Sequence, residues 1–171
     1  MHSSTARTIL GFARAFLGRR LPFLGEGERI NEIYNYLQIE DLFATSGQPS
    51  EAQFLLIREA GYETVINLAP TSVLENSVIN EDQILADLGL TYVHIPVDFK
   101  DPTEDDFGAF VDTLRRRTSE KVWVHCAANM RVSAFTYRYR REILSEDEAR
   151  ARSDLRKIWE PVGVWREFIN R

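Results

Sequence analysis

Short runs of β-branched and aromatic residues recur along this chain, separated by stretches of helical character. Three of them are Glu63 to Leu68, Thr91 to Val97 and Lys121 to His125. Compact apolar runs of this length are typical of strands buried on both faces of a sheet. Strands that alternate with helices of about ten residues are joined by right-handed crossovers. The pattern therefore predicts an α/β domain with a mainly parallel sheet flanked by helices on both faces.

Signals for helix starts and ends lie between these runs. A further extended stretch, Tyr36 to Ala44, is closed by a turn at residues 46–49. Gly61 and Gly89 end two predicted helices, and Pro161 separates the last two. Four helices are expected to begin at a capping residue followed three positions later by a polar side chain. These pairs are Ser50 and Gln53, Asn80 and Gln83, Thr103 and Asp106, and Ser145 and Glu148.

Composition excludes several classes of protein. The 171 residues are 44% hydrophobic and carry a formal net charge of −5, which favours one globular domain and argues against nucleic acid as a partner. The one cysteine, Cys126, leaves no partner for an intramolecular disulfide and no set of thiols for a metal cluster, which fits a reducing cytoplasmic compartment. No apolar run is long enough for an ordinary membrane-spanning helix.

The N-terminal segment, residues 1–29, differs from the rest of the chain, residues 30–171. Within it, residues 8–21 combine Arg14, Arg19 and Arg20 with apolar residues that fall largely on one side of a helical wheel. Those residues are Ile9, Leu10, Phe12, Ala13, Phe16 and Leu17. Two interpretations stay open: a helix in peripheral contact with an anionic membrane surface, or a helix docked on the domain.

Cys126 directly follows the strand that ends at His125, and a helix is predicted to start a few residues later. Ligands of parallel sheets bind at this edge, where loops run into helix N-termini. The N–H groups of such a loop form an anion-binding nest that favours a thiolate, and Arg131 adds a cation whose planar fork can hold two phosphate oxygens. The alternative is that Cys126 is a small apolar residue of the core.

The run His125-Cys126-Ala127-Ala128-Asn129-Met130-Arg131-Val132-Ser133 resembles the signature loop of protein tyrosine and dual-specificity phosphatases. In that loop, His-Cys is followed by five residues, Arg, and Ser or Thr. Residues 44–49 and 64–68 resemble a compact bacterial subfamily, and the resemblance covers roughly residues 33 to 170. It implies a cysteine-phosphatase-like fold and a phosphomonoester hydrolase that forms a phosphocysteine and needs no metal or other cofactor. Its substrate would be a phosphorylated protein or a small phosphomonoester.

The resemblance also implies roles. Cys126 is the nucleophile, Arg131 binds the phosphate oxygens, and the Ser133 hydroxyl stabilises the departing thiolate. His125 orients the loop. The general acid is expected after the strand that ends at Val97, and Asp98 is preferred over Asp101 because it is nearer the strand end. The remaining residues expected around the phosphate are Ala127, Ala128, Asn129, Met130 and Val132.

One departure from the family pattern leaves the activity open. Only four residues separate Cys126 from Arg131, while Ser133 stands at the usual offset. Either the loop is shorter and Arg131 still enters the pocket, or Val132 takes the arginine position and the protein is a weak phosphate-binding pseudophosphatase. A Cys-x4-Arg loop also resembles rhodanese-type sulfurtransferases, in which the cysteine carries a persulfide.

Two further expectations concern residues outside this loop. His94 interrupts an apolar strand and is expected to be buried and hydrogen-bonded. The arginines that follow Tyr137 are expected to form a solvated helix face: Arg138, Arg140 and Arg141. The sequence leaves the oligomeric state open.

Overall fold

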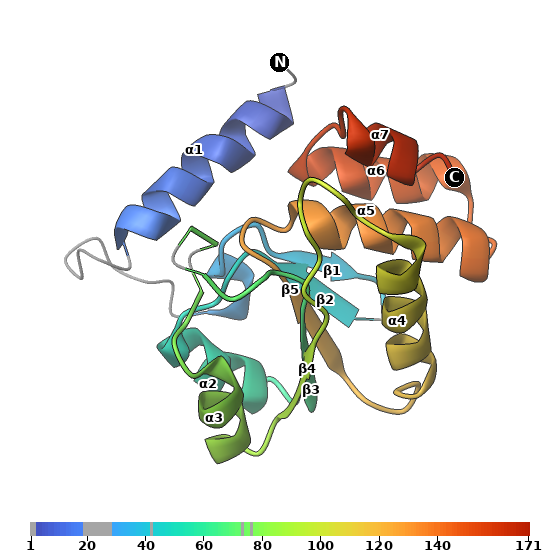
Figure 1. Ribbon diagram of the computed structural model, residues 1–171. Coiled ribbons are helices and arrows are strands. Elements are labelled where there is room, and N and C mark those ends of the chain that lie inside the picture. Colours follow the sequence, from blue (N-terminus) through green and yellow to red (C-terminus); the bar gives the residue numbers. More distant parts are fainter. Residues whose placement is uncertain (1–2, 19–28, 42, 73, 76) are drawn as a thin grey trace.

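The sheet has five strands in the order β1-β2-β5-β3-β4, seen in a computed structural model that describes residues 3–18, 29–41, 43–72, 74–75 and 77–171 (Figure 1). Strands β2, β5, β3 and β4 run parallel, and β1 is antiparallel to β2. The predicted α/β fold with a mainly parallel sheet is therefore confirmed. The strands span Leu37–Ile39 (β1), Phe43–Ser46 (β2), Thr64–Asn67 (β3), Thr91–His94 (β4) and Val122–His125 (β5).

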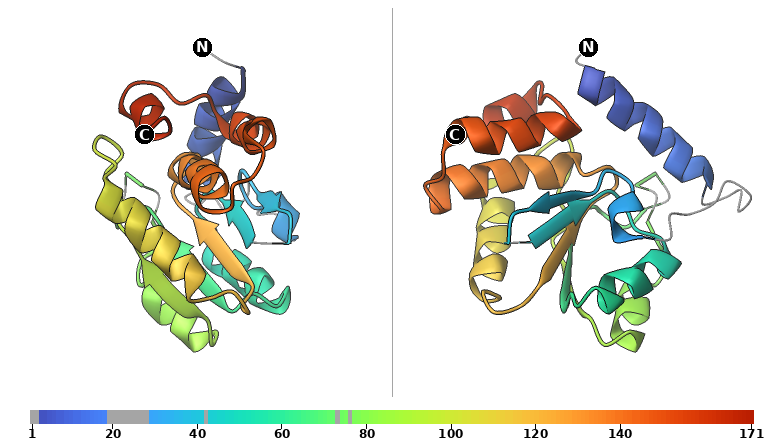
Figure 2. Two further views of the ribbon diagram at one scale, coloured as in Figure 1. Left: turned by 90° about the vertical axis from the view of Figure 1, so that its right-hand side faces the viewer. Right: turned by 180° about the vertical axis from the view of Figure 1, so that it is seen from behind.

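Helices cover both faces of this sheet (Figure 2). Helices α4 to α7 lie on one face and α2 and α3 on the other. The α-helices span Ser3–Gly18 (α1), Glu51–Glu59 (α2), Glu81–Asp87 (α3), Glu104–Arg115 (α4), Met130–Arg138 (α5), Glu148–Ile158 (α6) and Val164–Phe168 (α7). A 3-10 turn (η2) spans Ile30–Glu32, and a π-helical segment (η3) spans Tyr139–Ile143.

The central strand β5 divides the core into two layers. Val122 and Val124 point to the layer built with α4, α5, α6 and α7, whereas Trp123 points to the layer built with α2 and α3. This alternation follows from the two-residue period of a strand. Phe135 of α5 stacks on Phe168 of α7 with ring centroids 4.9 Å apart. Burial on both faces holds the carboxyl end of β5, where Cys126 lies, in a fixed position.

Two of the four predicted capping boxes form, at Ser50 with Gln53 and at Thr103 with Asp106. At the other two positions the predicted side-chain cap does not form, although α3 does begin directly after Asn80. Asn80 takes a left-handed conformation with φ 56°, and its side chain does not cap α3. Helix α6 is capped by Asp147, whose side chain accepts from the Arg150 amide, because Ser145 also turns left-handed with φ 53°. Helix α6 therefore begins two positions later than predicted, whereas α3 begins at the predicted residue without a side-chain cap.

The predicted strand from Tyr36 to Ala44 and the predicted burial of His94 differ from the structure. Tyr36 to Ala44 is not one strand, because the positive φ of 46° at Glu40 turns the chain between β1 and β2. His94 is exposed rather than buried, although its Nε2 lies 2.8 Å from the carbonyl oxygen of Ala69.

The arginines after Tyr137 are not a solvated face. Arg138 is buried between Glu104 and Glu142, and its guanidinium lies 4.1 Å from the centroid of the Phe107 ring. Arg140 is buried too and bonds Glu146 and Asp154. A buried guanidinium is tolerated where carboxylates satisfy its N–H groups, and a charge count along the sequence does not reveal those partners.

Helix α1 docks on the domain and packs against α6 (Figure 1). Its inward side differs from the predicted apolar face, because Thr8 is fully buried while Leu10 is 72% exposed. The reason is close packing. The Thr8 hydroxyl donates to the Ile158 carbonyl, and the absence of a side chain at Gly11 allows the Tyr34 ring to approach the helix. The predicted basic residues Arg19 and Arg20 lie outside the described residues, as does Leu21. Within the described ranges, no helix is long and apolar enough to cross a membrane.

Candidate active site

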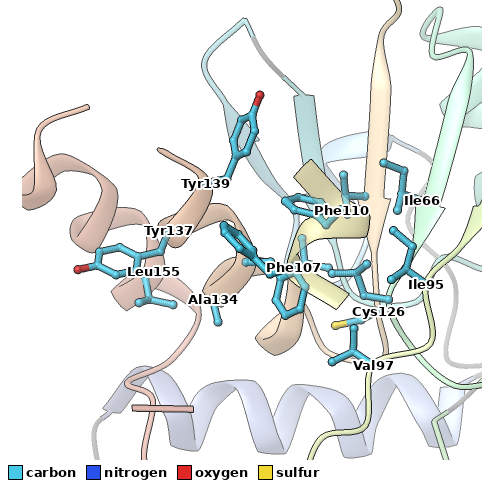
Figure 3. Packing of buried hydrophobic residues seen from close by; sticks show 14 of the residues in the cluster. Ile66, Ile95, Val97, Phe107, Phe110, Cys126, Ala134, Tyr137, Tyr139 and Leu155 are labelled. Atoms are coloured by element: carbon cyan, nitrogen blue, oxygen red, sulfur yellow. The ribbon is translucent and has the colours of Figure 1, made fainter. Parts of the chain in front are cut away.

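Cys126 lies at the carboxyl end of β5, between β2 and β3. Its side chain is buried, with 1% exposed, and Figure 3 shows the sulfur beside Val97 of the segment that follows β4. Its amide donates to the Ser46 carbonyl at 3.4 Å, which continues the pairing of β5 with β2. Cys126 is therefore held at the edge of a parallel sheet where ligands bind.

The carbonyl groups of Ala127 and Ala128, in the loop after Cys126, are hydrogen-bonded to other parts of the domain. The Ala127 carbonyl accepts from the Gln48 amide at 3.2 Å, and the Ala128 carbonyl accepts from Asn35 Nδ2 at 3.0 Å. In a trans peptide the C=O and the following N–H point in opposite directions. The N–H groups of Ala128 and Asn129 consequently point away from these partners, as an anion-binding loop requires.

Asn129 ends the loop and starts α5. Its φ of 63° is left-handed, a conformation that Asn tolerates better than most residues. The side chain is fully buried, and Nδ2 donates to the Asn35 carbonyl at 2.7 Å and to Thr45 Oγ1 at 2.9 Å. These bonds fix the point at which the helix begins.

Arg131 lies in the first turn of α5 and is 3% exposed. Its two terminal nitrogens donate to the two carboxylate oxygens of Glu75, at 2.9 and 2.8 Å. Its guanidinium lies 5.1 Å from the centroid of the Phe99 ring. Burial lowers the pKa of Arg131, but the bonds to Glu75 and the neighbouring Cys126 outweigh burial and raise that pKa above its ordinary value. Arg131 is therefore a permanent cation, and its Nε has no partner within the described ranges.

Cys126 and Arg131 line one cavity of about 310 Å³. Val132 is fully buried in the core instead. Of the two registers that the short loop allows, the structure has the one in which Arg131 faces the cavity. The cavity is lined by Thr8, Ile9, Phe12, Leu74, Glu75, Phe99, Cys126, Ala127, Ala128, Met130 and Arg131.

The predicted acids Asp98 and Asp101 and the predicted hydroxyl of Ser133 lie outside the lining of this cavity, as does Asn129. Asp98 and Asp101 are exposed, and Asp98 Oδ1 accepts from the Lys100 amide at 2.8 Å. Ser133 Oγ donates to the Met130 carbonyl at 3.0 Å and faces a separate small hollow.

His125 belongs to a buried polar network behind Cys126. Its Nε2 lies 2.9 Å from Glu81 Oε1, and Gln48 Nε2 donates to Glu81 Oε2 at 2.7 Å. Asn67 Nδ2 also donates to Glu81, at 3.2 Å. Burial raises the pKa of Glu81, but the attraction of His125 and the bonds from His125 and Gln48 prevail, so this pKa lies below its ordinary value. The network ties the ends of β5 and β3 to the start of α3.

Several of these residues were not predicted from the sequence. Gln48 lies inside the run at residues 44–49 that resembles the bacterial subfamily, so this run was a signal for it. Glu75 and Phe99 carry no such signal, since both are single residues in loops whose path depends on tertiary contacts. Within the described ranges, no group of three or more His, Cys, Asp or Glu side chains is placed to hold a metal ion.

A buried cysteine at the end of a central parallel strand, with an arginine in the first turn of the next helix, is the arrangement of a cysteine-phosphatase-like domain. Residues 28–161 match the family model described as "PTP-NADK: DSP-PTPase phosphatase fused to NAD+ Kinase". The chain belongs to this family of dual-specificity and tyrosine-phosphatase-like proteins, as its signature loop predicted.

Solved structures agree with this assignment. A candidate phosphatase (DUF442) of Shewanella putrefaciens CN-32 is 31% identical, with a TM-score of 0.71 over 81% of this chain and 90% of that chain. Tk-PTP in its active form shares the fold. It is 15% identical, with a TM-score of 0.68 over 80% of this chain and 94% of that chain. The "Beta-lactamase hydrolase-like protein" of Xylella fastidiosa is 33% identical over 97 residues, which are 56% of this chain and 22% of that protein. The chain thus matches about a fifth of the length of this curated relative.

The buried carboxylate behind the cysteine predicts a pH effect on stability. Because the pKa of Glu81 is lower in the folded than in the unfolded protein, its ionised form stabilises the fold above the ordinary value of 4.5. That stabilisation is lost as the pH falls below this value toward the folded pKa. Glu81→Gln should therefore lower the free energy of unfolding near neutral pH and flatten its dependence on pH below the ordinary value of 4.5. Urea unfolding at a series of pH values measures both effects.

Asp82→Asn is the matched control, because Asp82 is the exposed neighbour of Glu81 in the same helix turn. Its pH profile should follow that of the wild type. Equal profiles for Glu81→Gln and Asp82→Asn would show that the buried network does not stabilise the ionised carboxylate.

Proposed function

We propose that this protein hydrolyses phosphomonoesters through a phosphocysteine on Cys126. The observation that carries the proposal is that the buried side chains of Cys126 and Arg131 line one cavity, although only four residues separate them in the loop. In the first step the thiolate attacks phosphorus, an S–P bond forms, and the P–O bond to the leaving group breaks. In the second, water attacks phosphorus, the S–P bond breaks, and inorganic phosphate is released.

Arg131 and the loop amides supply the charge complementarity for both steps. Glu75 holds the two terminal nitrogens of Arg131, and Nε has no partner within the described ranges. A phosphate above Cys126 would accept from Nε and from the N–H groups of Ala127 to Met130. Donors fixed before the reaction stabilise the charge of the transition state most effectively.

Three further residues are assigned roles in this mechanism. Asp98 gives a proton to the leaving oxygen and recovers one from water in the second step, with Asp101 as the alternative. Asp98 is adjacent to Phe99, which lines the cavity, so a local change of this loop brings its carboxyl to the leaving group. Ser133 stabilises the thiolate once its hydroxyl turns away from the Met130 carbonyl, and His125 orients the loop from behind.

The family match favours phosphate over persulfide chemistry on the cysteine. The buried position of Val132 argues against the pseudophosphatase alternative, because Arg131 rather than Val132 faces the cavity. The substrate is a phosphorylated protein or a small phosphomonoester in the cytoplasm.

The exposed side of α1 favours a peripheral contact with a membrane. Leu10 and Arg14 are exposed on it, as expected of a helix that touches an anionic membrane surface. Leu10→Glu should abolish sedimentation of the protein with phosphatidylserine vesicles, whereas Leu55→Glu, on the exposed side of α2, should not. Absence of sedimentation by the wild-type protein would refute this contact.

The role of Arg131 predicts a large loss of turnover on substitution. A charge-assisted contact from Nε made mainly in the transition state is worth a few kcal/mol, so Arg131→Ala should lower kcat on an aryl phosphate by about 10²–10³-fold. Arg131→Lys should recover little of it, because a point charge does not reproduce the planar fork. Release of inorganic phosphate measures both.

Arg115→Ala is the control, since Arg115 lies on the exposed side of α4. It should keep the wild-type rate. An Arg131→Ala protein as active as the Arg115→Ala protein would refute the proposed role of Arg131 in catalysis.

The assignment of the acid predicts a dependence on the leaving group. Asp98→Asn should lower turnover of an alkyl phosphate by roughly 10²–10⁴-fold and that of an activated aryl phosphate much less, because a good leaving group departs without a proton. Asp101→Asn is the matched comparison. Should Asp101→Asn show this pattern while Asp98→Asn behaves as wild type, the acid is Asp101.

A further inference from the structure

Helix α1 forms part of the cavity that holds Cys126. Thr8, Ile9 and Phe12 line it together with Cys126 and Arg131, although more than a hundred residues separate them in the sequence. Figure 1 shows α1 as a separate helix that lies across the end of the domain near the start of α5. The cavity is thus completed by an element that precedes the family match, which begins at residue 28.

A tyrosine ring between two glycines sets the position of α1. A Cβ atom added at Gly11 of α1 would lie 2.7 Å from Tyr34 Cε2, and one added at Gly47, after β2, would lie 2.5 Å from Tyr34 Cδ1. Both distances are too short for a real side chain. The Tyr34 hydroxyl also donates to the Thr8 carbonyl, and the Gly47 amide donates to the Tyr34 carbonyl at 2.7 Å. Glycine at both positions therefore permits the close approach of α1 to the chain beside the Cys126 loop.

Hydrogen bonds tie the same turn of α1 to the cysteine loop and to α6. Asn35 Nδ2 donates to Thr8 Oγ1 at 3.2 Å and to the Ala128 carbonyl at 3.0 Å, so one amide group joins α1 to that loop. On the other side, Thr8 Oγ1 donates to the Ile158 carbonyl, and Thr5 Oγ1 accepts from the Glu160 amide at 3.0 Å. Partners on both sides hold α1 in a defined position.

The walls of the cavity are apolar, whereas its cysteine end is charged. Ile9 and Phe12 of α1, with Leu74 and Phe99, surround the approach to Cys126 and Arg131. A volume of about 310 Å³ is at the lower end of the range for small-molecule sites. Such walls bind the organic part of a phosphomonoester through buried apolar area and aromatic contacts.

We propose that α1 determines substrate specificity, with Phe12 contacting the organic group of the substrate and favouring aryl over small hydrophilic alkyl phosphomonoesters. This inference rests on the proposed function, because it assigns the phosphate to the Cys126 end of the same cavity. Phe12 acts on binding and not on bond breaking, so its effect should fall on KM rather than on kcat.

The experiment compares Phe12→Ala with wild type on p-nitrophenyl phosphate and on glycerol phosphate. Complete burial of one aromatic side chain corresponds to a change in affinity of about tenfold or more. Phe12→Ala should therefore raise KM for the aryl substrate about tenfold, leave its kcat within about twofold, and leave the kinetics of glycerol phosphate unchanged. Leu10→Ala is the matched control on the same helix and should behave as wild type on both substrates.

Gly11→Val provides a second variant, because its added side chain displaces α1 from Tyr34. It should raise KM for the aryl substrate more than KM for glycerol phosphate. If Phe12→Ala matches wild type on the aryl substrate, or changes both substrates equally, α1 does not determine specificity.

A binding measurement separates this inference from the proposed function. Phenyl phosphate should bind the Cys126→Ser protein about tenfold more tightly than it binds the Cys126→Ser, Phe12→Ala protein, whereas inorganic phosphate should bind both equally. If phenyl phosphate binds the two proteins with this difference in affinity but the wild-type protein shows no turnover, the proposed hydrolysis is refuted and the role of α1 is supported. Turnover without this difference would refute the role of α1 alone.

Discussion

The left-handed turn at Asn129 is the constraint on which the site depends. It ends the loop after Cys126 and starts α5, so it decides which side chain of the first helical turn faces the cavity. Bonds from the buried Asn129 amide to Asn35 and Thr45 hold it in place. With the helix starting there, Arg131 faces Cys126 and Val132 packs into the core. A loop one residue shorter than the usual pattern thus still joins a thiol to a guanidinium.

Hydrogen bonds hold the loop after Cys126 from two sides. Behind Cys126, His125 bonds the buried Glu81, a network that joins the ends of two parallel strands to α3. In front, Asn35 donates to Thr8 of α1 and to the Ala128 carbonyl, so the cavity wall and the loop after Cys126 share one hydrogen-bonding group. A shift of α1 would therefore alter the shape of the cavity and the support of the loop together. Rigid support of this kind keeps reactive groups in a productive geometry.

Local patterns in the sequence predicted the fold and the centre of the site, and distant contacts limited the rest. Apolar runs predicted the parallel strands, and the run from His125 to Ser133 predicted the family and contains two residues, Cys126 and Arg131, that line one cavity. Glu75 could not be predicted, because it reaches Arg131 through a loop without periodicity. The inward face of α1 was also missed, since Thr8 is buried there for hydrogen bonding and Gly11 lies there for close approach to Tyr34, rather than for hydrophobicity.

Identification of the covalent intermediate tests the central claim most directly. The wild-type protein, mixed rapidly with an aryl phosphate and quenched in acid during turnover, would be digested and its peptides analysed by mass spectrometry. We expect one phosphoryl group on the peptide that contains Cys126, and no phosphoryl group on the corresponding peptide of the Cys126→Ser protein. Steady release of inorganic phosphate with the Cys126 peptide unmodified throughout would contradict the account, because hydrolysis would then proceed without the cysteine.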